Sequence, residues 1–128
     1  MSGSDVDLLI ADDDDQIVSI LQFLFEREGY NIEVAENGRQ VKEYIAVNSA
    51  PKLVLLDVMM PYADGYELMD IMRTTDGWRD VPVIMLTAKS REEDIVKGLE
   101  KGVTEYVNKP FQPVEVVARV KFLLQKNV

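Results

Sequence analysis

The stretch from Leu53 to Gly65 constrains the fold more than any other part of this sequence. An apolar run of strand length, Leu53–Leu56, ends at a single carboxylate, Asp57, and a loop containing Pro61 leads into a helical pattern at Asp64-Gly65. A run this apolar is typical of a strand buried on both faces of a parallel sheet, because crossover helices cover both faces. Asp57 is therefore expected at the carboxyl end of a central strand, where open α/β sheets bind their ligands.

The rest of the chain alternates short apolar runs with helical periodicity. Strands are predicted over residues 6–11, 31–35, 53–57, 82–87 and 104–108. A helix follows each strand: the first ends near Gly29, the second contains Val41 and Ile45, and the others cover about 64–74, 90–101 and 113–125. This order predicts a single α/β domain, a (βα)5 doubly wound parallel sheet with helices on both faces. The domain is expected to span residues 5–126, and residues 1–4 are interpreted as a leader outside the fold.

Local signals support these boundaries. Asp64 is a suitable N-cap, Ser90 followed by Glu93 forms a capping-box pattern, and Asn37-Gly38 indicates a turn. The inward faces of the helices are predicted from their spacing as Ile17, Ile20, Leu21 and Leu24; Val41 and Ile45; Leu68, Met69 and Met72; and Val117, Val120 and Leu124. Methionines 59, 60, 69, 72 and 85 are interpreted as core residues, and Trp78 is placed in a polar loop over 75–80.

Cysteine and histidine are both absent. Without cysteine the chain has no disulfide, thiol nucleophile or cysteine metal site, and without histidine it lacks the commonest general base and transition-metal ligand. The remaining carboxylates, lysines and hydroxyls favour hard cations such as Mg²⁺. The net charge of −9 argues against nonspecific binding to nucleic acid or an anionic membrane. No apolar run approaches the roughly 20 residues of a membrane span, so a cytoplasmic protein is expected.

The polar residues of greatest interest each lie at the end of a predicted strand. Asp12 and Asp13 follow the first strand, Asp57 ends the third, Thr87 ends the fourth and Lys109 follows the fifth. Carboxyl ends of parallel strands share one edge, so these side chains are expected to converge. Clustered carboxylates raise one another's pKa unless a cation compensates. A carboxylate beside a cation, a hydroxyl and an ammonium group is suited to accept a phosphoryl group.

Each of these residues also has an ordinary structural interpretation. The Asp run is compatible with a solvated loop, Thr87 with a strand cap, Lys109 with a surface charge and Tyr106 with a half-buried aromatic side chain. Their shared position at one edge of the sheet is what favours the functional interpretation.

Taken together, these motifs resemble the receiver domains of response regulators in two-component signalling, including the chemotaxis regulator. The resemblance covers about residues 5–125 and rests on the pair Asp12-Asp13, the block 57–61 with Asp64-Gly65, Thr87-Ala88, and Tyr106 ahead of Lys109-Pro110-Phe111. It implies a flavodoxin-like strand order, 2-1-3-4-5. It also implies a cis peptide bond between Lys109 and Pro110.

The resemblance assigns roles to the residues of this edge. Asp57 would accept a phosphoryl group from phosphohistidine on a sensor histidine kinase or phosphotransfer protein. Asp13, Asp57 and the backbone carbonyl of Met59 would hold Mg²⁺, with Asp12 acting through water. Lys109 would pair with the phosphoryl oxygens. The domain would catalyse only its own phosphorylation and dephosphorylation, and so would not be an enzyme for an outside substrate.

The resemblance also implies a switch. Thr87 would donate its hydroxyl to the phosphoryl group, and its movement would let Tyr106 turn inward. That change would remodel the face formed by the fourth helix, fifth strand and fifth helix, and so control an output domain or target protein. A slow loss of the phosphoryl group is expected, because Met59 offers no group to orient water and Lys89 would cover the site.

Similarity to winged-helix regulators that carry this domain implies a weak, phosphorylation-favoured homodimer through the same face. Glu100 would meet Lys121 and Glu105 would meet Arg119 across the interface, around an apolar patch of Val96, Leu99 and Ala118.

Three other functions compete with this interpretation. An aspartyl-phosphate phosphatase of the haloacid dehalogenase type would need an acidic residue two positions after Asp57, where this chain has Met59. A mononucleotide-binding module would need a glycine-rich phosphate loop, and neither common pattern occurs. A receiver that docks without being phosphorylated is the third alternative, although all the required side chains are present.

Overall fold

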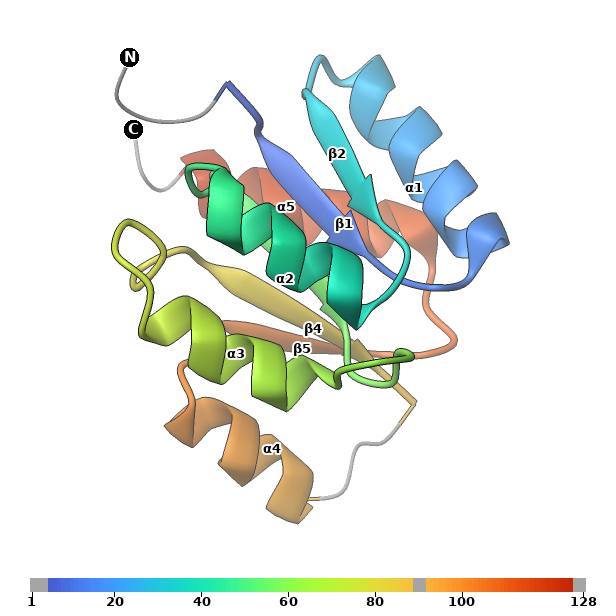
Figure 1. Ribbon diagram of the computed structural model, residues 1–128. Coiled ribbons are helices and arrows are strands. Elements are labelled where there is room, and N and C mark those ends of the chain that lie inside the picture. Colours follow the sequence, from blue (N-terminus) through green and yellow to red (C-terminus); the bar gives the residue numbers. More distant parts are fainter. Residues whose placement is uncertain (1–4, 89–91, 126–128) are drawn as a thin grey trace.

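The computed structural model describes residues 5–88 and 92–125, in which five strands alternate with five helices (Figure 1). In chain order the elements are β1 Leu8–Ala11, α1 Asp15–Arg27, β2 Ile32–Ala35, α2 Gly38–Val47, β3 Leu53–Asp57, α3 Gly65–Arg73, β4 Val83–Thr87, α4 Glu92–Glu100, β5 Glu105–Asn108 and α5 Pro113–Gln125. Every predicted element is present, and four of the strands begin one or two residues later than predicted. The predicted capping residue Ser90 lies outside the described residues.

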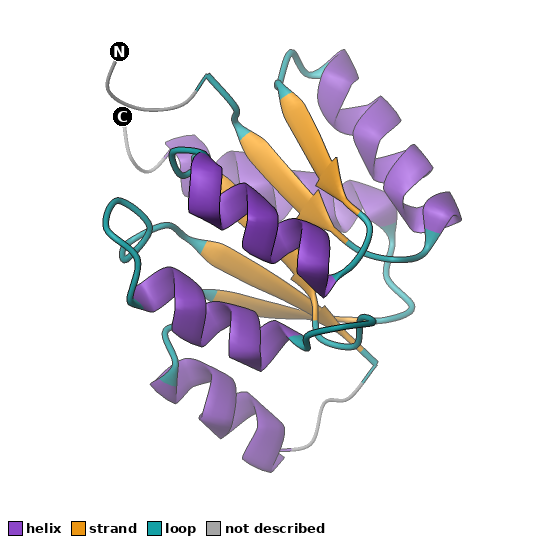
Figure 2. Ribbon diagram, viewed as in Figure 1, coloured by secondary structure: helices purple, strands orange, loops and turns teal. Residues whose placement is uncertain are grey.

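The strands form one parallel sheet in the order β2-β1-β3-β4-β5 (Figure 2). This is the order that the resemblance implied. β3 is central, pairing with β1 through Ala11 and Leu56 and with β4 through Asp57 and Leu86. Because all the strands run in the same direction, their carboxyl ends lie along one edge, and Asp57 is at that edge in the middle of the sheet.

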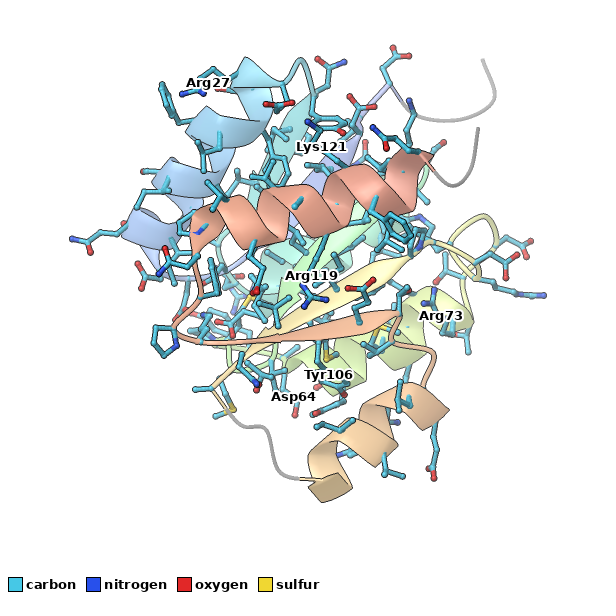
Figure 3. All side chains as sticks on the ribbon, turned by 180° about the vertical axis from the view of Figure 1, so that it is seen from behind. Arg27, Asp64, Arg73, Tyr106, Arg119 and Lys121 are labelled. Atoms are coloured by element: carbon cyan, nitrogen blue, oxygen red, sulfur yellow. The ribbon has the colours of Figure 1, made fainter. Side chains whose placement is uncertain are left out.

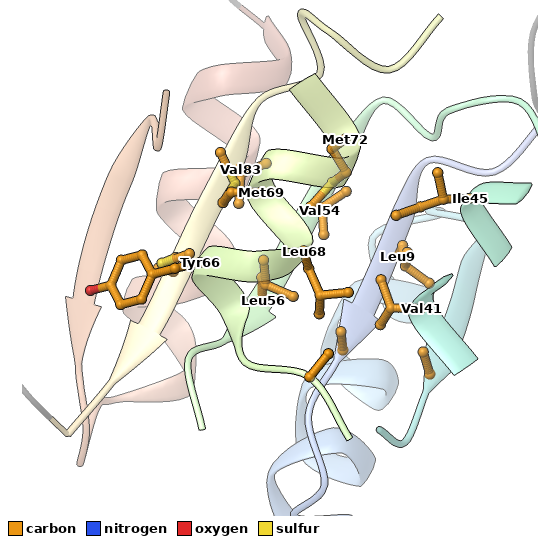
Figure 4. Close-up of a cluster of buried hydrophobic side chains, with 14 of the residues drawn as sticks. Leu9, Val41, Ile45, Val54, Leu56, Tyr66, Leu68, Met69, Met72 and Val83 are labelled. Carbon is orange, nitrogen blue, oxygen red and sulfur yellow. The ribbon is translucent and has the colours of Figure 1, made fainter. Parts of the chain in front are cut away.

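Alternation along the strands divides the interior into two hydrophobic cores, one on each face. On one face, strand residues such as Leu9, Val54 and Leu56 pack with side chains from α2 and α3 (Figure 4). On the other face, Leu8 and Ile10 pack with side chains from α1 and α5. Both faces of the sheet are therefore covered, which explains why the strand runs are apolar throughout rather than alternating.

The predicted inward faces hold for α2 and α3 but not for α1. α1 buries Val18, Leu21 and Phe25, whereas Ile20 is 49% exposed. The sequence offers two overlapping apolar stripes one residue apart, and helical periodicity cannot choose between them. Packing against both the sheet and α5 selects the stripe that contains Val18. On α5 the difference is smaller, since Val116 and Val120 are buried while the predicted Val117 and Leu124 are half-buried.

Trp78 is a core residue, although the sequence suggested a polar loop. Its side chain is 1% exposed and its indole Nε1 donates a hydrogen bond of 3.1 Å to the carbonyl oxygen of Asn48. The ring also meets Tyr44 edge-on, with centroids 6.0 Å apart. The loop between α3 and β4 is therefore held to the end of α2.

Polar side chains cap three helices at the edge that carries Asp57. Asp14, Asn37 and Asp64 accept hydrogen bonds from backbone N–H groups in the first turns of α1, α2 and α3, respectively. Asp64 was predicted in this role. Asn37 and Gly38 were predicted as a turn, but the structure uses Asn37 as an N-cap and Gly38 as the first residue of α2.

Arg73, at the end of α3, joins three segments at the opposite edge. Its guanidinium donates hydrogen bonds to the carbonyl oxygens of Trp78 at 3.2 Å, Val81 at 2.9 Å and Gly102 at 2.7 Å. Gly102 lies in the turn between α4 and β5 with φ of +93°. Arg73 therefore fixes the C-terminal end of α4 relative to α3. Among the described helices, none is long and apolar enough to cross a membrane.

Candidate functional site

The predicted site residues come together at the carboxyl edge of the sheet. Asp12 follows β1, Asp57 ends β3, and Lys109 follows β5. Lys109 Nζ lies 3.0 Å from Asp12 Oδ2 and 3.4 Å from Asp57 Oδ2, so one ammonium group bridges two carboxylates. Asp12 is separated from Lys109 by 97 positions in the sequence. The parallel topology, rather than any local motif, creates this contact.

Both carboxylates bridged by Lys109 are buried. Asp12 is 1% exposed and Asp57 is 5% exposed. The second oxygen of Asp12, Oδ1, accepts a hydrogen bond of 2.9 Å from the backbone N–H of Asp14. Oδ1 of Asp57 accepts a longer bond of 3.3 Å from the backbone N–H of Met59. The backbone hydrogen bond to Asp57 is therefore longer than the one to Asp12.

The electrostatics of the site follow from this burial. Burial and the neighbouring charge of Asp12 raise the pKa of Asp57 from 3.8 to about 6, although Lys109 acts in the opposite direction. Burial by itself would lower the pKa of Lys109, but its hydrogen bonds and charge interactions with Asp12 and Asp57 outweigh burial and raise that pKa. One lysine thus compensates two buried carboxylates incompletely, and the site retains an excess of negative charge.

A third carboxylate completes a candidate cation site. Asp13 is exposed, and one carboxylate oxygen from each of Asp12, Asp13 and Asp57 can be chosen so that all three lie within 4.8 Å of one another. A set of ligands made only of carboxylate oxygens, one of them from the exposed Asp13, suits a hard divalent cation that also binds water. A cation bound there would offset the excess negative charge of the same carboxylates.

The structure places the remaining predicted site residues beside this cluster. Thr87 is 2% exposed at the end of β4, one position beyond the residue that pairs with Asp57 in the sheet. The carbonyl oxygen of Thr87 accepts a hydrogen bond of 2.9 Å from the backbone N–H of Lys109, which joins the ends of β4 and β5. The side chain of Met59 is 57% exposed, so its interpretation as a core residue was wrong. The peptide bond between Lys109 and Pro110 is cis, as the resemblance implied.

Tyr106 lies apart from the acidic cluster, on β5 between α3 and α4. Its half-buried ring (Figure 3) packs against the core. Its hydroxyl group donates to the hydroxyl of Tyr66 at 3.4 Å. A β-carbon added at Gly98 of α4 would collide with the Tyr106 hydroxyl. Tyr106 therefore occupies a notch that only glycine provides.

Sequence reasoning missed both Tyr66 and Gly98 as neighbours of Tyr106. The only available signal was the glycine inside a helical pattern. An interior helical glycine costs about 1 kcal/mol relative to alanine, and one that persists there often serves close packing.

Three charged residues of the predicted output face, Glu105, Arg119 and Lys121, form ion pairs within the single chain. Arg119 Nη1 lies 2.8 Å from Glu105 Oε1, and Lys121 Nζ lies 2.9 Å from Glu28 Oε1. Glu28 was not foreseen as a partner of Lys121. Val96 and Leu99 of α4 are exposed, as an apolar surface patch requires.

The five-stranded order, with helices on both faces and clustered charged side chains at the carboxyl edge, defines a flavodoxin-like doubly wound domain. The chain belongs to the response regulator receiver domains, whose family model matches residues 8–121. It is a phosphoacceptor domain of two-component signalling.

Curated relatives of this chain are transcriptional regulatory proteins. It is 42% identical over 120 residues to the alkaline phosphatase synthesis transcriptional regulatory protein PhoP of Bacillus subtilis, covering 94% of this chain and 49% of that protein. It is 41% identical over 121 residues to the transcriptional regulatory protein SrrA of Staphylococcus aureus, covering 94% and 48%. The chain thus spans about half the length of these relatives.

Solved structures agree with the fold. The receiver domain of the Francisella response regulator 1452 matches with a TM-score of 0.86 and 33% identity, covering 96% of this chain and 99% of that one. The response regulator DrrB, an OmpR/PhoB homologue from Thermotoga maritima, matches with a TM-score of 0.81 and 30% identity, covering 95% and 54%.

Proposed function

We propose that Asp57 is the phosphoacceptor and that it takes a phosphoryl group from a phosphohistidine on a sensor histidine kinase or phosphotransfer protein. The observation that carries this assignment is the position of Asp57. It is a buried carboxylate at the end of the central strand, 3.4 Å from the ammonium group of Lys109 and beside the acidic pair.

The chemistry follows from these groups. A carboxylate oxygen of Asp57 attacks phosphorus, the bond between phosphorus and the imidazole nitrogen breaks, and the imidazole keeps the bonding electrons and takes up a proton. The raised pKa of Asp57 makes its carboxylate more basic than an ordinary aspartate, which favours attack. Lys109 is placed to pair with the phosphoryl oxygens, and the hydroxyl of Thr87 donates to one of them.

The acidic cluster is the proposed binding site for Mg²⁺. Asp13, Asp57 and the backbone carbonyl of Met59 would hold the ion, with Asp12 acting through water. A bound Mg²⁺ would offset the negative charge that the phosphoryl oxygens add to this site. This assignment rests on the three carboxylate oxygens within 4.8 Å and on the incomplete compensation by Lys109.

The domain acts only on itself in this proposal. An outside phosphate ester would need a proton donor for its leaving group, and the position expected for such an acid holds Met59. Phosphorylation and dephosphorylation of Asp57 are therefore the only reactions proposed, and they would take place in the cytoplasm. Loss of the phosphoryl group from Asp57 would be slow. Met59 is exposed beside the site, and Lys89, the second residue of that prediction, lies outside the described residues.

The phosphoryl donor would dock beside Lys109. An apolar groove of about 540 Å³ there is lined by Ile17 and Ile20 of α1 and by Pro110, Phe111 and Pro113 before and at the start of α5. Ile20 is 49% exposed and lies outside both hydrophobic cores, and the groove adjoins Lys109, which contacts Asp57. Replacing Ile20 with Asp should slow transfer from a sensor kinase while leaving phosphorylation by acetyl phosphate unchanged. Equal effects on both donors would contradict docking in the groove.

The output would be controlled through α4, β5 and α5. Phosphorylation would shift Thr87, and Tyr106 would respond in its notch between Tyr66 and Gly98. The signal would pass to an output domain or target protein, consistent with the transcriptional regulators among the relatives. The same face would support a weak homodimer of phosphorylated domains.

Acetyl phosphate tests the acceptor assignment directly. With Mg²⁺ the protein should gain the mass of one phosphoryl group, and chelation of the metal should prevent this. Asp57→Asn should abolish the adduct. Asp64→Asn is the matched control, because it removes an exposed carboxylate from the same loop while asparagine caps a helix as well as aspartate. An undiminished adduct in Asp57→Asn would refute the assignment.

A further inference from the structure

The loop between Asp57 and α3 carries the proposed Mg²⁺ ligand Met59, and it is closed at its base by the backbone. The N–H of Gly65 donates to the carbonyl oxygen of Val58 at 2.8 Å. An added β-carbon at Gly65 would lie only 3.1 Å from the Asp57 carbonyl oxygen and the Val58 Cα. Residues 59–64 therefore leave the sheet and return to it at nearly the same place.

The outer part of this loop rests on the first turn of α2. The N–H of Gly38 donates to the carbonyl oxygen of Pro61 at 2.9 Å. A β-carbon at Gly38 would lie 2.6 Å from both the backbone nitrogen and the β-carbon of Ala63, and 2.7 Å from its carbonyl oxygen. Ala63 is itself buried. Because backbone atoms stand in the way, a side chain at position 38 would force the loop and α2 apart.

A second contact holds the same part of the loop. The guanidinium carbon of Arg39 lies 4.2 Å from the centre of the Tyr62 ring, within the range of a cation–π interaction. Tyr62 has a φ of +76°, which a non-glycine residue adopts only when its surroundings hold it there. The strained backbone at Tyr62 indicates that α2 fixes the loop, rather than merely touching it.

We infer that Gly38 and Arg39 are positioning residues for the cation site: they clamp the loop 59–64 against α2 and so hold the backbone of Met59 at the acidic cluster. α2 contributes no ligand itself. Its buried side chains, Val41 and Ile45, fix it to the core, so the loop is the part that moves when the clamp is disturbed. This inference rests on the proposed function of the cluster as a Mg²⁺ site.

The test is the affinity for Mg²⁺ of the unphosphorylated protein, measured by titration of amide NMR resonances. Gly38→Ala should raise the dissociation constant about tenfold or more, the range typical for residues that orient metal ligands. Arg39→Ala removes only the aromatic contact and should raise it by a smaller factor. At saturating Mg²⁺, phosphorylation by acetyl phosphate should recover in both variants.

Gly29→Ala is the matched control. Gly29 follows the C-terminal end of α1, has a φ of +93°, and has no atom within 4 Å of the position of an added β-carbon. It strains the backbone without touching the loop, and its Mg²⁺ affinity should equal that of the wild type. A folded Gly38→Ala with an affinity within twofold of the wild type would overturn the clamp. Should Gly38→Ala fail to fold, an unchanged affinity in Arg39→Ala would overturn it instead. A wild type that neither binds Mg²⁺ nor takes a phosphoryl group would contradict the proposed function, which is a separate outcome.

Discussion

Asp57 should destabilise the metal-free domain, because its buried charge is poorly compensated. Its pKa is raised from 3.8 to about 6 on folding, first by burial and then by the charge of Asp12. The folded state therefore binds this proton more tightly than the unfolded state does. Above about pH 6 the carboxylate is ionised in both states, and the folded state carries the penalty. As the pH falls through 6 toward 4, the folded protein takes up the proton and the penalty disappears.

The size of the effect follows from the shift. About two pKa units at about 1.4 kcal/mol each correspond to about 3 kcal/mol at pH 7 and above. Asn has the same shape without the charge, so Asp57→Asn should raise the free energy of unfolding by about 1–3 kcal/mol, the lower figure allowing for weaker contact with Lys109. The gain should shrink toward zero near pH 4.

Urea unfolding in the presence of EDTA measures this difference, with fluorescence of the sole tryptophan, Trp78, as the probe, because it is buried in the folded state. The two proteins should be compared at pH 7.5 and pH 4.5. Saturating Mg²⁺ at pH 7.5 should narrow the gap, since the ion stabilises the wild type more. Asp64→Asn, at an exposed position, should stay within about 0.5 kcal/mol of the wild type. This account of the site would be refuted if Asp57→Asn were no more stable than the wild type at pH 7.5. It would also be refuted if the difference in free energy of unfolding between the two proteins were the same at pH 7.5 and pH 4.5.

Three further predictions concern the fold and the output face. Arg73→Ala should lower the free energy of unfolding in urea by about 2–4 kcal/mol, because three carbonyl acceptors lose a charged donor. Arg79→Ala removes one exposed ion pair and should lower it by about 0–1 kcal/mol. Equal losses in the two variants would contradict the role of Arg73. Gly98→Ala should displace the Tyr106 ring and cost about 1–3 kcal/mol, and unchanged ring resonances in NMR would count against the notch. Sedimentation of the beryllofluoride-activated domain should show weak dimers that Arg119→Glu weakens further, and a dimer indifferent to that change would argue against this face.

The sequence was sufficient for the architecture and for most of the site. Apolar runs of strand length separated by helical periodicity identified the elements. A strand that is buried on both faces is apolar throughout, whereas a helix that is buried along one stripe is apolar only at every third or fourth residue. Parallel strands then required their carboxyl ends to meet, which placed Asp12, Asp57 and Lys109 together without any knowledge of distances. The individual role of each residue came from the resemblance to receiver domains, since a lone lysine or threonine has no pattern that reveals a function.

The tertiary structure decided what depends on the separation between elements that are distant in the chain. Whether α1 buried Ile20 or instead Val18 and Phe25 was settled only by packing, because both choices have helical spacing. Trp78 became a core residue because the loop over 75–80 folds back onto α2. Asn37-Gly38 looked like a turn because a side-chain cap and a turn use the same residue types. The contact of Gly38 with Ala63 left no signal, since a missing β-carbon is informative only when the neighbouring backbone is in place.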